Sequence, residues 1–97
     1  MALELRFARR AQIDLDMIYQ HGAQAFGLPQ ADRYAVDMMA CLDGLCDFPF
    51  TGTQVEAEQP DLRRRPCGAH VIFYLVTASS VEVVRILHQR MDPARHL

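Results

Sequence analysis

Lysine and tryptophan are absent from the 97 residues, and all ten cationic side chains are arginine. No segment approaches the roughly 18 consecutive apolar residues of a membrane span, and neither an integral membrane protein nor a membrane partner is expected. The sequence also lacks a glycine-rich phosphate loop, a serine triad and a paired-carboxylate site. A net charge of only −2 gives no reason to expect direct binding to nucleic acid.

The cysteines are few and odd in number: Cys41, Cys46 and Cys67. The first residues lack the basic start and apolar run of a signal peptide, so a reduced, cytoplasmic protein is expected. Cys67 and His70 suggest half of a zinc site, but the spacing of the cysteines is poor for a metal. The cysteines are therefore expected to be small buried hydrophobic residues, with no metal and no cofactor.

Charge is distributed unevenly along the chain. Residues 1–60 contain four arginines and nine acidic residues, a balance of −5, whereas residues 61–97 contain six arginines and three acidic residues, a balance of +3. This asymmetry predicts a directional surface whose basic part meets an acidic partner. Genomic base composition explains the absence of lysine equally well.

Two helices are predicted in the first half, after a short strand. Residues 3–7 alternate apolar and polar side chains, as in a strand with one buried face. Residues 8–25 and 29–47 carry apolar side chains at helical spacing, and Gly27 with Pro29 separates the two helices. A connection this short predicts an antiparallel helical hairpin.

The second half is predicted to be extended. The polar segment 53–61 is expected to be a connecting loop, and strands are expected at 62–66, 70–76 and 81–88, followed by a helical turn at 92–97. The order is β-α-α-β-β-β: a three-stranded antiparallel meander, joined by the N-terminal strand, under the helical hairpin. The expected fold class is α+β, with residues 1–97 forming a single two-layer domain.

The apolar, turn and strand-end residues together resemble the ParE toxin family over nearly the whole chain. The most specific part is the run from Val84 to Asp92, Val-Arg-Ile-Leu-His-Gln-Arg-Met-Asp. The other matching positions are Ala11, Asp14, Leu15, Ile18, Gly27, Ala31, Tyr34, Leu45, Pro49, Gly52, Leu62, Arg63 and 70–74. One departure is visible, because Phe7-Ala8-Arg9-Arg10 offers no side-chain cap where family members often begin the first helix with serine or threonine and proline.

The resemblance implies the RelE/ParE fold, a ParD-type antitoxin as partner, and inhibition of DNA gyrase by binding. Nucleic acid would then be contacted only indirectly, through the antitoxin complex. The enzymatic alternative is an mRNA interferase of the RelE type, with Arg63, Arg85 and His88 around the scissile phosphate. The absence of lysine, the negative net charge and the lack of an aromatic residue after Tyr74 argue against it. A decayed toxin that only binds its antitoxin is a third possibility.

Six residues are predicted to bind the antitoxin or gyrase, and none is predicted to be catalytic; they are Arg63, Arg65, Tyr74, Arg85, His88 and Arg90. Arg63 and Arg65 share one face of their strand, where they serve either a partner or a solvated edge. In a regular strand, Arg85 would share a face with Val83 and Leu87, and would either await a ligand or pair with a carboxylate such as Asp14 or Glu4. Tyr74 is most simply a core residue with its hydroxyl at a polar edge.

Overall fold

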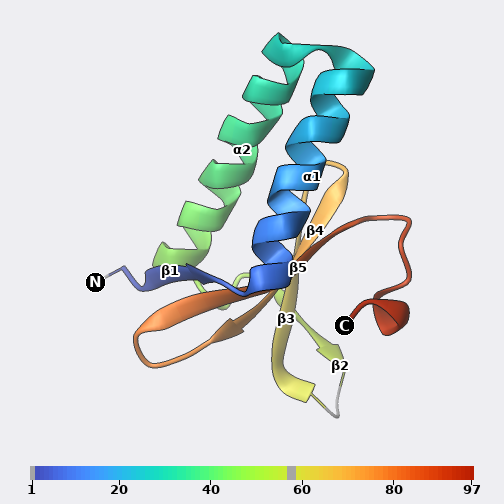
Figure 1. Ribbon diagram of the computed structural model, residues 1–97. Helices are drawn as coiled ribbons and strands as arrows, with labels where there is room; N and C mark the ends of the chain where they lie inside the picture. Colours follow the sequence, from blue (N-terminus) through green and yellow to red (C-terminus); the bar gives the residue numbers. More distant parts are fainter. Residues whose placement is uncertain (1, 57–58) are drawn as a thin grey trace.

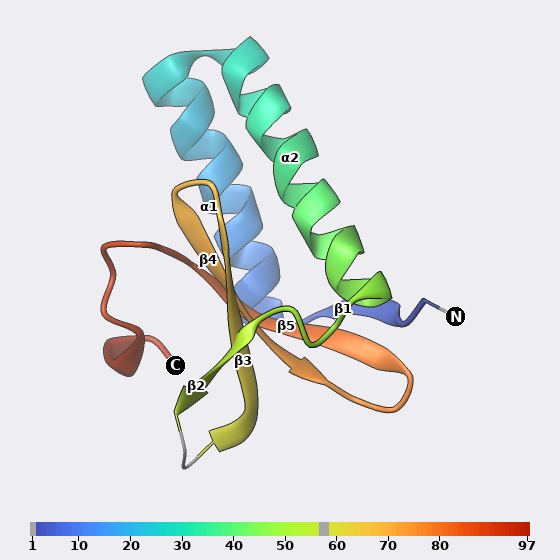
Figure 2. The same ribbon diagram turned by 180° about the vertical axis from the view of Figure 1, so that it is seen from behind.

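A helical hairpin packs on one face of a twisted sheet, as Figures 1 and 2 show from opposite sides. The structure is a computed structural model that describes residues 2–56 and 59–97. The prediction of an α+β fold is confirmed. The elements are, in order, β1 (Glu4–Phe7), α1 (Arg9–Phe26), α2 (Leu28–Asp47), β2 (Thr53–Glu56), β3 (Gln59–Cys67), β4 (His70–Val76), β5 (Ser80–His88) and the 3-10 turn η1 (Pro93–Arg95).

The sheet of the described residues has five strands in the order β1-β5-β4-β3-β2. β3, β4 and β5 form the predicted antiparallel meander, and β1 joins it as a parallel neighbour of β5. The parallel pairing leaves β1 at the edge where α1 can cross back over the sheet. The helical hairpin therefore packs over the β1-β5 side of the sheet (Figure 1).

The prediction of a loop over 53–61 is wrong at both of its ends. Thr53–Glu56 forms the edge strand β2, and β3 begins at Gln59; residues 57 and 58 lie outside the described part of the chain. β2 pairs with β3, and its residue Val55 packs against the apolar cluster beneath. A short polar edge strand lacks the apolar alternation by which strands are recognised.

Helix α1 begins without a side-chain cap, as the departure from the family pattern predicts. Ala8 is the N-cap residue, and no side chain accepts a hydrogen bond there. Instead, the Ala8 N–H donates to the Val83 carbonyl at 2.8 Å, which ties the helix start to β5. The position of the helix is thus determined by the sheet and not by a local capping motif.

Strand β5 is irregular in the middle, so the expected faces of its side chains are wrong. Tyr74 pairs with Val83, but the preceding residue Phe73 pairs with Arg85, which leaves Val84 as an extra residue in β5. After this bulge the alternation changes: Val83 and Ile86 face the helices, while Leu87 joins the cluster on the far side. Next to the bulge, the Arg85 side chain reaches Asp14 of α1.

The sheet has an apolar cluster on each side. The helix-side cluster includes Leu42, Leu45 and Tyr74. The far-side cluster is built from Leu62, Val71, Phe73 and Leu87, which are all buried although they lie on the face opposite to α1 and α2. Consequently this face is not the open sheet surface that a two-layer fold leads one to expect.

Two of the three cysteines are not free. Cys41 of α2 and Cys67 of β3 form a disulfide with Cα atoms 6.5 Å apart, and Cys46 is free and buried. The expectation of three reduced cysteines is therefore wrong for this pair, because residues far apart in the chain are brought together by the packing of α2 on the sheet. Within the described residues, no three or more His, Cys, Asp or Glu side chains are grouped to hold a metal ion. None of the helices there is both long and apolar enough to cross a membrane.

Candidate partner-binding surface

The guanidinium of Arg85 forms a largely buried ion pair with Asp14. Its Nε donates to Asp14 Oδ2 at 2.8 Å and its Nη2 donates to Asp14 Oδ1 at 3.0 Å, a bidentate arrangement. The Ile86 N–H donates to the same Oδ2 at 2.9 Å. The hydrogen bonds with Asp14 raise the pKa of Arg85 above its usual value, although burial acts in the opposite direction. Of the two roles considered for Arg85, pairing with Asp14 is the one found.

The position of Asp14 follows from the path of the chain. β1 pairs with β5 only as far as Val83, and α1 begins immediately afterwards. The edge of β5 beyond Val83 would otherwise have unpaired backbone groups, and the Asp14 carboxylate satisfies the Ile86 N–H there. Arg85 Nη1 donates to the His96 carbonyl at 2.7 Å, and this bond links the C-terminal segment to β5.

A tyrosine and two histidines are clustered where β4 and β5 meet the helices. The Tyr34 hydroxyl lies 2.6 Å from His70 Nδ1 and accepts a hydrogen bond from the Ala69 N–H at 3.0 Å. The hydroxyl also donates to the Cys67 carbonyl at 3.4 Å, so the direction of its bond with Nδ1 depends on the tautomer of His70. Burial lowers the pKa of His70, and the neighbouring His88 lowers it further, with ring centroids 5.4 Å apart. The Arg90 N–H donates to His88 Nδ1.

Arg63, in the middle of β3, lies against an exposed aromatic side chain. Its Nη1 donates to the Gly52 carbonyl at 2.7 Å, and its guanidinium lies 5.0 Å from the centre of the Phe50 ring. Phe48 and Phe50 are 68% and 66% exposed. We call Phe50 and Arg63 the Phe–Arg patch.

Tyr74 supports this patch from beneath. Its side chain is fully buried, and its hydroxyl donates to the Pro49 carbonyl at 2.7 Å and accepts from the Gly52 N–H at 3.0 Å. These two bonds hold the loop that presents Phe50. Tyr74 therefore lies out of direct reach of a partner in this conformation.

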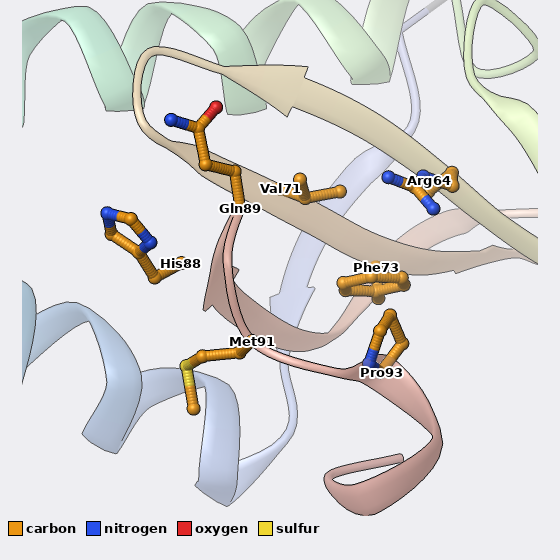
Figure 3. A pocket seen from close by; sticks show the side chains of 7 residues that line it. All are labelled: Arg64, Val71, Phe73, His88, Gln89, Met91 and Pro93. Atoms are coloured by element: carbon orange, nitrogen blue, oxygen red, sulfur yellow. The ribbon is translucent and has the colours of Figure 1, made fainter.

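A small pocket of about 150 Å³ lies beside the far-side cluster, and Figure 3 shows the side chains around it. Arg64 lies over the Phe73 ring, 5.8 Å from its centre, and Pro93 of the C-terminal segment lies beside the same ring. His88 is well separated from Arg64 in this view, with its ring directed away from it (Figure 3). Arg65 hydrogen-bonds to the Pro66 carbonyl.

Comparison with known proteins identifies the family. The family model described as "ParE toxin of type II toxin-antitoxin system, parDE" matches residues 5–93. The chain belongs to the ParE toxin family. It is 38% identical over 92 residues to Toxin ParE1 of Caulobacter vibrioides, covering 95% of each chain. It is 34% identical over 88 residues to Toxin ParE1 of Mycobacterium tuberculosis, covering 90% of each.

Solved structures give the same fold at lower sequence identity. A chain from the chromosomal ParDE system of P. aeruginosa superposes with a TM-score of 0.76 and 22% identity, covering 90% of this chain and 96% of that one. The YoeB/ParE toxin of Agrobacterium tumefaciens gives a TM-score of 0.64 at 15% identity, covering 90% and 99%. The RelBE2 toxin–antitoxin complex of Mycobacterium tuberculosis gives 0.62 at 17%, covering 92% and 100%.

In this ParE-family chain, the predicted site residues do not converge on one place. Arg63 lies in the Phe–Arg patch, Arg85 lies against α1, and His88 with Arg90 lies at the end of β5. On these surfaces, three contacts or groups escaped prediction: the Tyr34–His70 bond, the position of Arg64 over Phe73, and the exposed phenylalanines. Only the last had a signal in the sequence, since two phenylalanines flank Pro49 directly after a predicted helix.

Proposed function

We propose that this chain is the toxic component of a type II toxin–antitoxin pair, that it inhibits DNA gyrase by binding, and that a ParD-type antitoxin neutralises it. Membership of the ParE toxin family supports the proposal over most of the chain. The fold shared with a chain of a ParDE system is consistent with an antitoxin partner. The proposed setting is the cytoplasm, with nucleic acid contacted only through the antitoxin complex.

The dispersal of Arg63, Arg85 and His88 is the observation that favours binding over catalysis. A site that cleaves RNA needs cationic and acid–base groups converging on one phosphate. Arg85 already donates from Nε and Nη2 to the Asp14 carboxylate and from Nη1 to the His96 carbonyl. Arg63 is held by the Gly52 carbonyl on another part of the sheet. The arrangement therefore supports a protein ligand better than an mRNA interferase.

The Phe–Arg patch is the surface that we propose for partner contact. Aromatic and arginine side chains dominate the energetics of protein interfaces, because they bury large areas and still form hydrogen bonds. Arg63 is already oriented by the Gly52 carbonyl and the Phe50 ring, so little side-chain freedom remains to be lost on binding. The exposed Arg90 and the C-terminal segment 91–97 offer a second, separate contact at the end of β5.

Inhibition by binding requires no reacting group on the toxin. A protein that holds gyrase in one conformation of its cycle blocks turnover if its affinity for that conformation exceeds its affinity for the others. The antitoxin would then act by covering the same surface or by stabilising a toxin conformation that gyrase does not accept.

Induction of the chain in bacterial cells tests the proposal directly. Early DNA synthesis should fall before protein synthesis does, and co-expression of the cognate antitoxin should restore it. In a purified system, the chain should inhibit supercoiling by gyrase. A block of translation with intact replication would identify an mRNA interferase instead, and unaffected growth under strong expression would identify a decayed toxin.

Two variants locate the contact. Phe50→Ala and Arg63→Ala should each raise the concentration needed for half-maximal inhibition of gyrase by about tenfold, as expected for a central interface residue. Arg33→Ala is the matched control, since it removes the same charge from an exposed position on α2. Equal effects of Arg33→Ala and Arg63→Ala would mean that net charge, and not the patch, determines binding.

A further inference from the structure

The disulfide between Cys41 and Cys67 joins two layers of the fold. Cys41 lies in α2, and Cys67 is the last residue of β3, directly before the Gly68-Ala69 turn into β4. The two cysteines are 26 positions apart in the sequence. Cys67 is 7% exposed, whereas Cys41 is only partly buried.

A hydrogen-bonded contact reinforces the same junction. Tyr34 lies seven positions before Cys41 on α2, close to two helical turns, so both side chains face the sheet. The Tyr34 hydroxyl binds the Ala69 N–H and His70 in the turn that Cys67 introduces. Gly68 has φ of 58°, and a Cβ there would lie 2.7 Å from the Tyr34 hydroxyl. The β3–β4 turn is thus held against α2 by one covalent and one hydrogen-bonded attachment.

We propose that Cys41 and Cys67 form a thiol–disulfide exchange site for small thiols and disulfides of the glutathione class, which sets how firmly α2 is attached to the β3–β4 turn. In reduction, a small thiolate attacks the more accessible Cys41 sulfur, breaks the bond to Cys67 and forms a mixed disulfide, and Cys67 leaves as a thiolate that takes up a proton. A second small thiol then attacks the mixed disulfide. Its products are the Cys41 thiol and one molecule of the small disulfide.

Accessibility and spacing distinguish this pair from the third cysteine. Exchange depends on access of the attacking thiolate to a sulfur, which the partly buried Cys41 provides. Cys46 is buried within the helix-side core, and burial raises the pKa of its thiol, with Asp43 and Asp47 acting in the same direction. A raised pKa keeps Cys46 in the unreactive thiol form. It therefore serves as an internal reference.

The disulfide closes a loop between residues 26 positions apart and so restricts the unfolded chain. The oxidised and reduced forms should therefore differ measurably in their stability. The equilibrium constant for unfolding is expected to rise on the order of a hundredfold on reduction. This corresponds to a fall in the thermal midpoint of roughly 10–20 °C for a domain of this size. Hydrogen exchange at the Ala69 amide should also become faster, since the turn then loses its covalent attachment to α2 and keeps the Tyr34 contact with that helix.

The test equilibrates the purified chain at graded ratios of reduced to oxidised glutathione, then alkylates the thiols under denaturing conditions for counting by mass spectrometry. Wild type and Cys46→Ser should each lose two alkylatable thiols on oxidation, with the bond mapped to Cys41 and Cys67. The thermal midpoint should rise in step. The double variant Cys41→Ser/Cys67→Ser should show a midpoint that does not respond to the glutathione ratio.

Several results would overturn the proposal. Three alkylatable thiols at every ratio would show that no exchange site exists, and a bond mapped between Cys41 and Cys46 would show that the wrong pair had been identified. A midpoint that stays constant while the Cys41–Cys67 bond forms would remove the proposed effect on attachment. The thiol count is a direct readout that does not depend on the activity of the toxin, so it stands apart from the proposal on gyrase.

Discussion

The carboxylate of Asp14 and the guanidinium of Arg85 form a bidentate ion pair across α1 and β5, with N–O distances of 2.8 and 3.0 Å. Both side chains are largely buried, at 14% and 10% exposure. The pair links three parts of the fold, because Arg85 also donates to the His96 carbonyl. It thereby holds the C-terminal segment close to the bulge in β5.

Removal of the carboxylate should be costly. Asp14→Ala leaves a buried guanidinium without its counter-charge and leaves the Ile86 N–H without its acceptor, so we expect a loss of about 3–5 kcal/mol in the free energy of unfolding. Urea denaturation measures it. Asp16→Ala, on the exposed side of the same helix, should change the stability by less than about 0.5 kcal/mol. A loss below 1 kcal/mol for Asp14→Ala would mean that the ion pair contributes little.

The double variant Asp14→Ala/Arg85→Leu separates the pair from its parts. Removal of both charges relieves the unpaired guanidinium, so the double variant should be more stable than Asp14→Ala alone. The double-mutant cycle then gives the coupling energy between the two residues. Additive losses would contradict a direct interaction.

The helices could be predicted because their signals are local. Apolar residues at helical spacing identify each helix, and Gly27 with Pro29 marks the boundary within three residues. β2 was missed because its sequence, Thr-Gln-Val-Glu, contains a single apolar residue and so has no apolar alternation to detect. The bulge at Val84 was missed because it depends on the partner strand β4, and the register of two strands cannot be derived from either strand alone.

The site was predictable only as far as single residues were concerned. Asp14 was correctly named as a possible partner of Arg85, because a charge inside an apolar strand requires one. The disulfide was not predicted, because Cys41 and Cys67 meet only after α2 packs on the sheet. The bond between Tyr34 and His70 escaped for the same reason.

Two glycines should respond to the same substitution with opposite signs. A Cβ at Gly52 would collide with the Tyr74 hydroxyl and would lie 2.7 Å from the Arg64 carbonyl, so Gly52→Ala should destabilise the fold by about 1–3 kcal/mol. Gly44 lies in α2 with no atom within 4 Å of an added Cβ, so Gly44→Ala should stabilise it by about 0.5–1 kcal/mol. Chemical denaturation of the two variants decides the matter. An unchanged free energy of unfolding in Gly52→Ala would imply that the loop carrying Phe50 shifts at little energetic cost.

The hydroxyl of Tyr74 should contribute separately. Tyr74→Phe leaves the Pro49 carbonyl without a donor and the buried Gly52 N–H without an acceptor, with an expected cost of about 1–3 kcal/mol. Because these bonds hold the loop carrying Phe50, the variant should also weaken the proposed binding to gyrase. Unchanged inhibition in a supercoiling assay, despite the loss in stability, would separate the core role of Tyr74 from the patch.

His70 should make the stability of the fold depend on pH. Its folded-state pKa is lowered by burial and by His88, with a smaller contribution from His21 in the same direction, while Asp14 opposes the shift. The folded protein therefore disfavours the charged imidazole more than the unfolded chain does. The resulting stability is fully present above the unfolded pKa of about 6.5 and is lost as the pH falls from there through the lowered folded value.

His70→Gln isolates this contribution, because glutamine does not titrate. Between pH 8 and pH 5, the thermal midpoint of wild type should fall further than that of His70→Gln, whereas His88→Gln should still respond to pH through His70. Tyr34→Phe removes the hydroxyl that lies 2.6 Å from Nδ1, and the sign of the resulting change in the pKa of His70, followed by NMR, identifies the donor: a rise if the hydroxyl donates, a fall if Nδ1 does. Parallel pH profiles for wild type and His70→Gln would assign the acid sensitivity to other groups. An unmoved His70 pKa in Tyr34→Phe would leave burial and the neighbouring histidines as the causes of the shift.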